Sequence, residues 1–415
     1  MKKGFVVLSH QGLTMVGVIA DQLAQRGMAA CVLASRSARA IAPDWLERVA
    51  CSHVTDALSL TQQDVDRFID VASRDIEIVG CISVWDAYRG LMAHANRRIG
   101  ARDAAPEAIA RLRDKYAFRS TLNEHGLSRK QARLLDAATF ASLNERSRYF
   151  VKPRTGLASF GAFRADKLRD FAELAELWQW AAADRAYDGV FASQPEFIVE
   201  DFIRGDEFSF EVSVYRNSAI VHAIHEKVDL TAAARTVLEN ACVCPPVGLS
   251  GQAIDTGANF VTRCLSALSV DEGVYHVEAR YHEQDGWELI EANPRIGGAY
   301  IVDSTRLHCG VDLIGRWIEL IGDTCEAQAA EARRKTFFRV FFGEPGRIVA
   351  RLDRRDTGHP SVIDKLFVKE GERLPQADRE IFIGQALWDV TSIPSSEFDA
   401  FVDTSKAHFA VEYQA

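Results

Sequence analysis

The sequence predicts a protein of the α/β (α+β) class with more than one domain. Near the N-terminus, short apolar runs flank an amphipathic helix, which is typical of a parallel α/β layer. From residue 196 onward, strands that alternate polar and apolar residues dominate, which is typical of antiparallel sheets. A length of 415 residues exceeds what one ordinary core supports, so two or three domains are expected.

Residues 1–105 are expected to form a Rossmann-like α/β layer. Its predicted elements are strands at 4–8, 29–34 and 78–84 and a helix at 13–26 that ends before Gly27. Trp85 and Asp86 follow the third strand, where ligands of open α/β sheets bind, although ordinary loop packing explains them equally well. The loop Ser9-His10-Gln11-Gly12 lacks the G-x-G-x-x-G pattern, which argues against a dinucleotide site.

A domain boundary is predicted at Ala104-Ala105-Pro106, and the next domain is expected to span residues 106–335. Its predicted helices lie at 106–125, 136–147, 166–183, 251–268 and 310–321, and its predicted strands at 149–152, 196–203, 207–215 and 219–228. The third helix repeats apolar residues at helical spacing, which indicates core packing rather than a binding surface. These residues are Leu168, Phe171, Leu174, Ala175 and Trp178.

Residues 336–415 show short strands with turns and then a closing helix, which predicts a separate β-rich C-terminal unit.

The segment from Val274 to Ile301 predicts a hairpin that carries chemistry. Alternation over 274–281 and 287–292 predicts two strands, and Asp285-Gly286 is a two-residue turn signal. With that turn, Glu278 lies opposite Asn293 and Glu291 lies on the diagonal, all on one face. Directly opposed Cβ atoms are roughly 5 Å apart. Two carboxylates and an amide oxygen at such spacing suit Mg²⁺.

The alternative is a surface hairpin with solvated acids. The neighbouring residues Val277, Leu289 and Ile290 are apolar, however, and unpaired carboxylates in such a half-buried context are costly. We therefore favour the metal site. Arg295 follows the hairpin, and Gly297-Gly298 next to it can bring backbone N–H groups close to an anionic substrate.

Lys152 ends a predicted strand and precedes a loop rich in small residues. Its ammonium can hold phosphate oxygens as a point charge, and the loop can wrap a triphosphate through the N–H groups of Gly156, Ser159 and Gly161. On the strand at 219–228, His222 and Glu226 face one way and His225 and Lys227 the other. This segment lacks the H-E-x-x-H pattern, so a zinc site is not expected. One face of the strand is expected to contact nucleotide or substrate, and we favour Lys227 for that contact.

The motif Glu278…Glu291-Ala-Asn293-Pro-Arg295-Ile-Gly297-Gly298 resembles the metal and phosphate motif of the ATP-grasp ligases. The similarity is greatest to carboxylate–amine ligases that join amino acids, and it covers about residues 106–325. It implies an ATP-grasp fold, with the N-terminal layer, a central ATP-grasp domain that has a mobile lid at about 130–195, and the C-terminal unit.

The resemblance also implies roles for residues that carry no clear signal alone. Lys115 corresponds to an early phosphate-binding lysine, although by composition it is an ordinary solvated helix lysine. The stretch Glu200-Asp201-Phe202-Ile203 resembles the hinge that binds adenine, and Glu207 stands where the family places a carboxylate on the ribose; exposed strand acids are the alternative. Lys152 and Arg295 are the implied catalytic residues.

The implied reaction joins a small-molecule carboxylate to an amine through an acyl phosphate, with ATP and two Mg²⁺ ions, for which Mn²⁺ can substitute. Three alternatives remain: a bicarbonate-activating carboxylase or purine-pathway ligase of the same family, a non-catalytic nucleotide-binding protein, and an oxidoreductase. Covalent acyl-enzyme chemistry has no support, because no G-x-S-x-G motif occurs.

Composition restricts the partners. The net charge is −9 and no basic run occurs, so no nucleic-acid partner is expected. No apolar stretch approaches the roughly 20 residues of a membrane span, so no membrane partner is expected either. Scattered cysteines and the absence of a convincing secretory signal favour a cytoplasmic location. A homodimer is an expectation from the resemblance alone.

Overall fold

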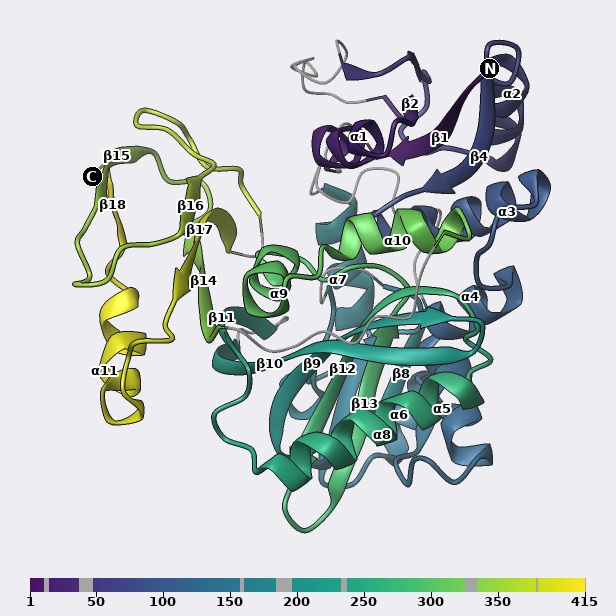
Figure 1. Ribbon diagram of the computed structural model, residues 1–415. Coiled ribbons are helices and arrows are strands. Elements are labelled where there is room, and N and C mark those ends of the chain that lie inside the picture. The colour runs from purple at the N-terminus through teal and green to yellow at the C-terminus, as the bar shows by residue number, and fades with distance from the viewer. Residues whose placement is uncertain are drawn as a thin grey trace.

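The computed structural model (Figure 1) describes residues 1–10, 15–36, 48–156, 160–183, 196–232, 237–324, 334–377 and 380–414. Within these ranges the strands form four sheets, of which one is parallel and three are antiparallel. Helices cover the parallel sheet and the large antiparallel sheet. The predicted α/β (α+β) class is therefore confirmed.

The parallel sheet has the strand order β3-β2-β1-β4 and lies in the N-terminal layer. Its strands are β1 (Lys2–Ser9), β2 (Ala29–Ala34), β3 (Cys51–Val54) and β4 (Ile76–Ile82), and its helices are α1 (Val16–Gln25), α2 (Gln62–Ala72), the 3-10 turn η2 (Asp86–Tyr88) and α3 (Arg89–Ile99). The third predicted strand begins and ends two residues earlier than expected. Buried apolar runs in β1 and β2 explain why this sheet needs cover on both faces.

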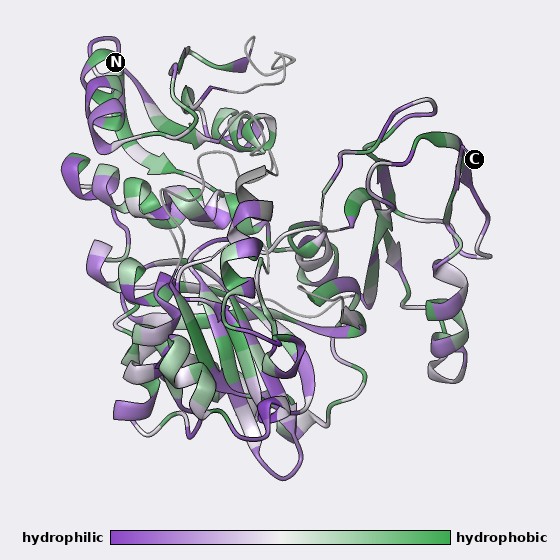
Figure 2. Cartoon of the chain, turned by 180° about the vertical axis from the view of Figure 1, so that it is seen from behind, coloured by the Kyte–Doolittle hydropathy of each residue, from purple (hydrophilic) through white to green (hydrophobic). Residues whose placement is uncertain are grey.

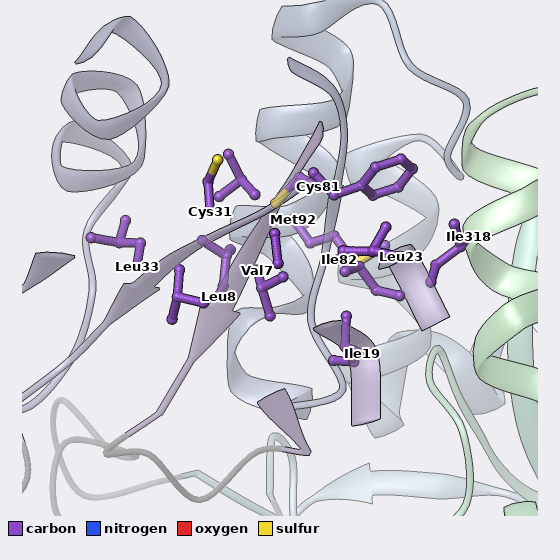
Figure 3. Packing of buried hydrophobic residues seen from close by; sticks show 14 of the residues in the cluster. Val7, Leu8, Ile19, Leu23, Cys31, Leu33, Cys81, Ile82, Met92 and Ile318 are labelled. Carbon is purple, nitrogen blue, oxygen red and sulfur yellow. The ribbon is translucent and has the colours of Figure 1, made fainter. Parts of the chain in front are cut away.

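Helix α10 (Leu313–Ile321) lies late in the sequence but packs on the N-terminal sheet. Asp312 caps it, because its carboxylate accepts hydrogen bonds from the N–H groups of Ile314 and Gly315. Figure 3 shows Ile318 of α10 near Leu23 in the same buried cluster. The N-terminal layer is thus joined to the rest of the chain by a shared core. The helix predicted from residue 310 starts at Leu313.

The predicted helix at 106–125 is wrong as a single element. The chain forms α4 (Pro106–Arg113) and α5 (Lys115–Glu124), separated at Asp114, whose backbone is extended. The Asp114 carboxylate accepts from the N–H groups of Tyr116 and Ala117, so it ends one helix and caps the next. Lys115 therefore stands in the first turn of a helix, not in the middle of one.

A small antiparallel sheet with the order β5-β8-β6-β7 follows. Its strands are β5 (Ala132–Leu134), β6 (Tyr149–Pro153), β7 (Phe163–Arg164) and β8 (Phe197–Asp201), and its helical elements are α6 (Ala137–Ser142), η3 (Arg146–Arg148), η4 (Ala165–Lys167) and α7 (Glu173–Ala183). The helix predicted at 166–183 begins only at Glu173. Leu168 and Leu174 are buried against this sheet, as expected, but Ala175 is exposed.

The central sheet is antiparallel and has the order β13-β12-β9-β10-β11-β14-β17-β16. Its first part comprises β9 (Asp206–Tyr215), β10 (Ser218–Ala232), β11 (Val237–Cys244), β12 (Gly273–His282) and β13 (Gly286–Asn293), with α8 (Gly251–Ala267) packed on it and α9 (Ile301–Cys309) after it. Figure 2 shows hydrophobic colour running along these strands. Helix α9 was not predicted.

The predicted register of the hairpin is wrong. Tyr281 pairs with Trp287, so the turn has more than two residues, and Gly286 sits at its end with φ +75°. A bulge at Ile290 then shifts the pairing, which brings Glu278 opposite Glu291 instead of Asn293. Because the bulge compensates for the longer turn, Glu278, Glu291 and Asn293 still line one cleft, as predicted.

The C-terminal strands are β14 (Thr336–Gly343), β15 (Val349–Arg354), β16 (Ile363–Leu366), β17 (Ile381–Asp389) and β18 (Phe409–Tyr413). Three of them extend the central sheet, because β14 pairs with β11, so this unit does not have a wholly separate sheet. The closing helix α11 (Ser395–Ser405) is followed by β18, which pairs with β15. The domain boundaries stay predictions. In the described part of the chain, no helix combines the length and apolar character of a membrane span.

Candidate functional site

A cleft lies between the small sheet and the central sheet. Strands β6 and β8 supply one wall, and β9 to β13 supply the other. Its lining residues are Asp86, Lys115, Phe150, Lys152, Pro153, Gly156, Phe160, Ala162, Glu200, Phe202, Ile203, Glu207, Lys227, Leu230, Val237, Glu239, Glu278, Arg280, Ile290, Glu291, Asn293 and Arg295. Apolar side chains and charged side chains both line it, which suits a ligand with a flat ring and a charged tail.

Lys152 and Glu200 form a buried ion pair across neighbouring strands β6 and β8. The Lys152 Nζ lies 2.5 Å from a Glu200 carboxylate oxygen, and both side chains are about 4% exposed. Burial, Arg119 and Lys115 together lower the pKa of Lys152, although Glu200 opposes this shift. Burial acts to raise the pKa of Glu200, but Lys152 and Arg119 outweigh it and the pKa is lowered. Glu200 is therefore held ionised, whereas its attraction offsets only part of the shift that lowers the pKa of Lys152.

Lys115 reaches across the cleft to Glu291. Its Nζ lies 3.1 Å from a Glu291 oxygen, and the Asn293 amide donates to the other oxygen at 2.9 Å. Burial opposes charge on both groups, yet their mutual attraction raises the pKa of Lys115 and lowers that of Glu291. The placement of Lys115 at the start of α5 thus makes it a site residue rather than a solvated helix lysine.

Lys227 occupies the middle of a group of three glutamates. Its Nζ lies 2.7 Å from Glu207, 3.0 Å from Glu239 and 3.3 Å from Glu278. Burial acts to lower the pKa of Lys227, but the three carboxylates outweigh it and raise the pKa well above its ordinary value. Arg280 donates to the second Glu207 oxygen at 2.9 Å.

His276 links Glu278 to the buried Glu211. Its Nδ1 lies 2.8 Å from Glu211, and its Nε2 lies 3.2 Å from Glu278. Burial acts to lower the pKa of His276, but Glu211 and Glu278 outweigh it and raise the pKa to about 10. The protonated ring of His276 thereby orients the carboxylate of Glu278, which lies opposite Glu291.

The donor set of this cleft fits Mg²⁺. Glu278 and Glu291 are directly opposed on β12 and β13, and Asn293 lies on the same strand as Glu291. No group of three or more histidine, cysteine, aspartate or glutamate side chains is arranged for a metal in the described ranges. Two carboxylates completed by phosphate oxygens and water are the usual way in which proteins hold Mg²⁺.

The charges lining the cleft support the same conclusion. Six carboxylates and five cations line it, so a triphosphate alone would meet no net positive charge. The carboxylates are Asp86, Glu200, Glu207, Glu239, Glu278 and Glu291, and the cations are Lys115, Lys152, Lys227, Arg280 and Arg295. Metal ions bound with the triphosphate would supply the missing positive charge.

Several predicted site residues do not line the cleft. The Asp201 carboxylate instead accepts from the N–H group of Gln131. Gly161 has φ +64° and lies in the loop after β6, but it is not a lining residue. Gly297 is buried and Gly298 is exposed, just before α9. Ser159 lies outside the described residues.

Sequence reasoning missed several residues of the site. Arg280 lies two residues from Glu278 on one strand, so alternation alone could have indicated it. Phe150 stands in the same relation to Lys152. Glu239 had no such signal, because it comes from β11, and Asp86, which the sequence placed after a strand of the N-terminal layer, does line the cleft.

The two glycines before α9 give a matched prediction. A Cβ on Gly297 would lie 2.6 Å from Ile301 Cγ2 and 2.8 Å from His276 Nδ1, whereas a Cβ on Gly298 would meet nothing within 4 Å. We expect Gly297→Ala to lower the midpoint of thermal unfolding by several degrees, for an overpacking cost of about 1–3 kcal/mol. Gly298→Ala should leave it unchanged, and equal shifts for the two variants would contradict this geometry.

Two buried histidines give a pH prediction. Burial and Arg316 lower the pKa of His222 to about 4, and burial also lowers that of His225 to about 4. Both are therefore neutral in the folded protein at neutral pH. Their contribution to the free energy of unfolding should be fully present above pH 6.5 and be lost as the pH falls toward 4. Each histidine contributes on the order of 2–3 kcal/mol to the free energy of unfolding at neutral pH.

Urea unfolding between pH 7 and pH 4.5 tests this. Replacing His222 and His225 by glutamine should flatten the pH dependence of the free energy of unfolding. If the free energy of unfolding changes with pH in the same way for the wild type and the double variant, these histidines do not cause its pH dependence.

Comparison with known proteins agrees with the architecture. Residues 147–303 match the family model described as the ATP-grasp domain. The fold is similar to that of an L-amino acid ligase from Bacillus licheniformis, with a TM-score of 0.80, 17% identity, and coverage of 100% of this chain and 99% of that chain. The family match assigns an ATP-grasp domain to residues 147–303, and the likeness in fold to the solved structure extends over the whole chain.

Two other solved structures with a similar fold carry the names of different enzymes. A phosphoribosylglycinamide synthetase from Anaerococcus prevotii matches with a TM-score of 0.69 and 14% identity, covering 100% of both chains. A biotin carboxylase from Campylobacter jejuni matches with a TM-score of 0.68 and 11% identity, covering 100% of this chain and 92% of that chain.

One sequence relative was found, the uncharacterised protein y4rH of Sinorhizobium fredii. It is 25% identical over 315 residues, which are 72% of this chain and 61% of that protein. The match thus spans less than two thirds of the relative.

Proposed function

We propose that this protein is an ATP-dependent ligase that joins a carboxylate to an amine, and that both substrates are amino acids. The observation that carries the proposal is the opposed pair Glu278 and Glu291 at the base of a cleft that also holds Lys115 and Lys152. The full-length likeness in fold to an L-amino acid ligase supports the same substrate class.

The chemistry has two steps. A carboxylate oxygen of the acid attacks the γ-phosphorus of ATP, the bond from that phosphorus to the β,γ-bridging oxygen breaks, and ADP leaves. The amine nitrogen then attacks the carbonyl carbon of the acyl phosphate, the carbon–oxygen bond to phosphate breaks, and the nitrogen loses a proton. ATP is needed because oxide is a very poor leaving group from a free carboxylate.

The residues of the cleft divide this work. Phe150, Phe202 and Ile290 offer apolar surface to the adenine ring, and the backbone next to Ile203 supplies the hinge. Lys115 and Lys152 hold phosphate oxygens, and Arg295 holds the negative charge of the acid or the transferring phosphoryl group. When bound, Mg²⁺ ions at Glu278, Glu291 and Asn293 neutralise charge on the phosphates.

Nucleotide binding then requires an exchange of partners. Lys115 pairs with Glu291 and Lys227 with Glu278. If Glu278 and Glu291 held metal ions, their carboxylates would turn away from Lys227 and Lys115, and the two ammonium groups would be free for phosphate or substrate oxygens. Lys227, which lines the cleft, would thereby be free to hold a substrate oxygen, and the N–H groups of Gly297 and Gly298 stay proposed contacts of the substrate.

A substrate panel tests the proposal. We expect Mg²⁺-dependent ADP release only when an acid and an amine are both present, and a product whose mass is their sum minus one water. Pairs of amino acids should be assayed with ADP detection and mass spectrometry.

The other outcomes are informative. A broad amino-acid panel without stimulated ADP release would contradict the dipeptide version. Bicarbonate-stimulated release would favour a carboxylase, and stimulation by a purine-pathway intermediate would favour that class; the similar folds of such enzymes motivate both controls. ATP binding without turnover would indicate a non-catalytic nucleotide-binding protein.

A further inference from the structure

Two arginines with buried side chains contact strand β13 and the segment that follows it. Arg89 is 1% exposed and Arg119 is fully buried. Arg89 comes from α3 of the N-terminal layer, and Arg119 comes from α5. Each donates to a backbone carbonyl near the residues proposed to bind metal.

The two contacts flank those residues. The Arg119 Nη2 donates to the carbonyl of Leu289 at 2.7 Å, two residues before Glu291. The Arg89 Nε donates to the carbonyl of Pro294 at 2.8 Å, between Asn293 and Arg295. The two carbonyls are five residues apart in the sequence, one before and one after Glu291 and Asn293.

Strand β13 needs this support for two reasons. Among the described strands it is the outermost of the central sheet, so one row of its peptide groups faces no other strand of that part of the chain. The bulge at Ile290 also interrupts its pairing with β12, directly before Glu291.

Each guanidinium is itself held in place. Arg89 forms a two-point contact with Asp103, in which its Nη1 lies 2.8 Å from one oxygen, and Asn96 donates to that oxygen at 2.9 Å. Arg119 contacts Glu288 at 2.5 Å and donates to Ser128 at 3.0 Å. A fork of fixed donors holds a carbonyl in one position better than a flexible ammonium does.

We propose that Arg89 and Arg119 are positioning residues that clamp the segment bearing Glu291 and Asn293 at its two ends, and so set its affinity for metal ions. This inference rests on the proposed function, because it takes Glu291 and Asn293 as metal ligands. It also gives the N-terminal layer a part in the site, since Arg89 and Asp103 hold the backbone between Asn293 and Arg295.

Two variants at Arg89 test the clamp. Arg89→Lys keeps the positive charge but loses the fork that serves Asp103 and Pro294 together. Arg89→Met combined with Asp103→Asn removes the buried charges as a pair, so neither is left unpartnered. Should the second variant fail to fold, the first still gives the answer.

The readout is Mn²⁺ affinity, measured by electron paramagnetic resonance in the presence of a saturating non-hydrolysable ATP analogue. We expect the Mn²⁺ dissociation constant to rise at least about ten-fold in both variants, as for other groups that orient metal ligands. Binding of the analogue in EDTA should change less than about three-fold, because the contacts of Arg89 with Asp103 and Pro294 lie away from Phe150, Phe202 and Ile290. A purely structural role would lower the melting temperature without changing the metal affinity of the folded protein.

Arg26→Met is the matched control. Arg26 also ties the N-terminal layer to α10, through Glu319 at 2.6 Å, but it does not contact β13 or Pro294. Its Mn²⁺ affinity should equal that of the wild type. Folded Arg89 variants that bind Mn²⁺ within two-fold of the wild type would overturn the clamp alone. A wild type that binds the analogue but no Mn²⁺ would overturn the proposed function with it.

Discussion

Replacing Glu291 by glutamine is expected to lower ATP turnover about a thousand-fold, equivalent to about 4 kcal/mol in the transition state. Glutamine keeps the shape of the side chain but removes one of two opposed carboxylates on β12 and β13. It also removes the anionic partner of Lys115, which lies 3.1 Å away. The measurement is ADP release with the substrate pair that gives the highest rate, together with Mn²⁺ affinity in the presence of an ATP analogue.

Glu283→Gln is the matched control for this variant. Glu283 lies in the turn of the same hairpin and its side chain is exposed. The variant should turn over ATP at the wild-type rate. A Glu291→Gln protein that retains more than a tenth of wild-type turnover would contradict the role of Glu291 as a metal ligand.

Replacing Lys152 by methionine is expected to lower turnover about a hundred-fold and to raise the KM for ATP. The change removes a cation from the phosphate site and leaves Glu200 buried, with Arg119 at 3.5 Å as its remaining ion-pair partner. Breaking a buried pair by removing one partner typically costs about 3–5 kcal/mol of stability. Urea unfolding and steady-state kinetics measure the two effects separately.

A double variant separates stability from catalysis. Lys152→Met combined with Glu200→Gln removes both charges, so most of the lost stability should return while turnover stays low. Lys167→Met, at an exposed lysine of η4, should have wild-type stability and turnover. Recovery of turnover in the double variant would show that Lys152 serves only to neutralise Glu200.

The face on which the acids lie was predictable from the sequence, but their pairing was not. Alternation places Glu291 and Asn293 on one face of their strand, and Glu278 shares that face in every register that differs from the predicted one by an even number of residues. The register depends on the turn length and on the bulge at Ile290, and a bulge leaves little trace in a single sequence.

Contacts between strands that lie far apart in the chain could not be predicted from the sequence either. Lys227 was favoured only from its position on an alternating strand, and the structure surrounds it with Glu207, Glu239 and Glu278 from three other strands. That arrangement follows from the strand order, in which β9 lies between β12 and β10.

Some local signals were present and not used. Asp114 is a helix-capping residue placed directly before Lys115, and capping predicts a new helix start there. The resemblance to ATP-grasp ligases suggested a role for Lys115 that its position in one long helix would not have explained. The extended backbone at Asp114 accounts for how Lys115 reaches the cleft.

A crystal structure with Mn²⁺ and a non-hydrolysable ATP analogue tests the central claim most directly. The account predicts anomalous scattering from Mn²⁺ at about 2.2 Å from carboxylate oxygens of both Glu278 and Glu291, with the triphosphate directed toward Lys115 and Lys152. Nucleotide bound outside the cleft, or Mn²⁺ bound away from both glutamates while these stay paired to Lys227 and Lys115, would contradict it.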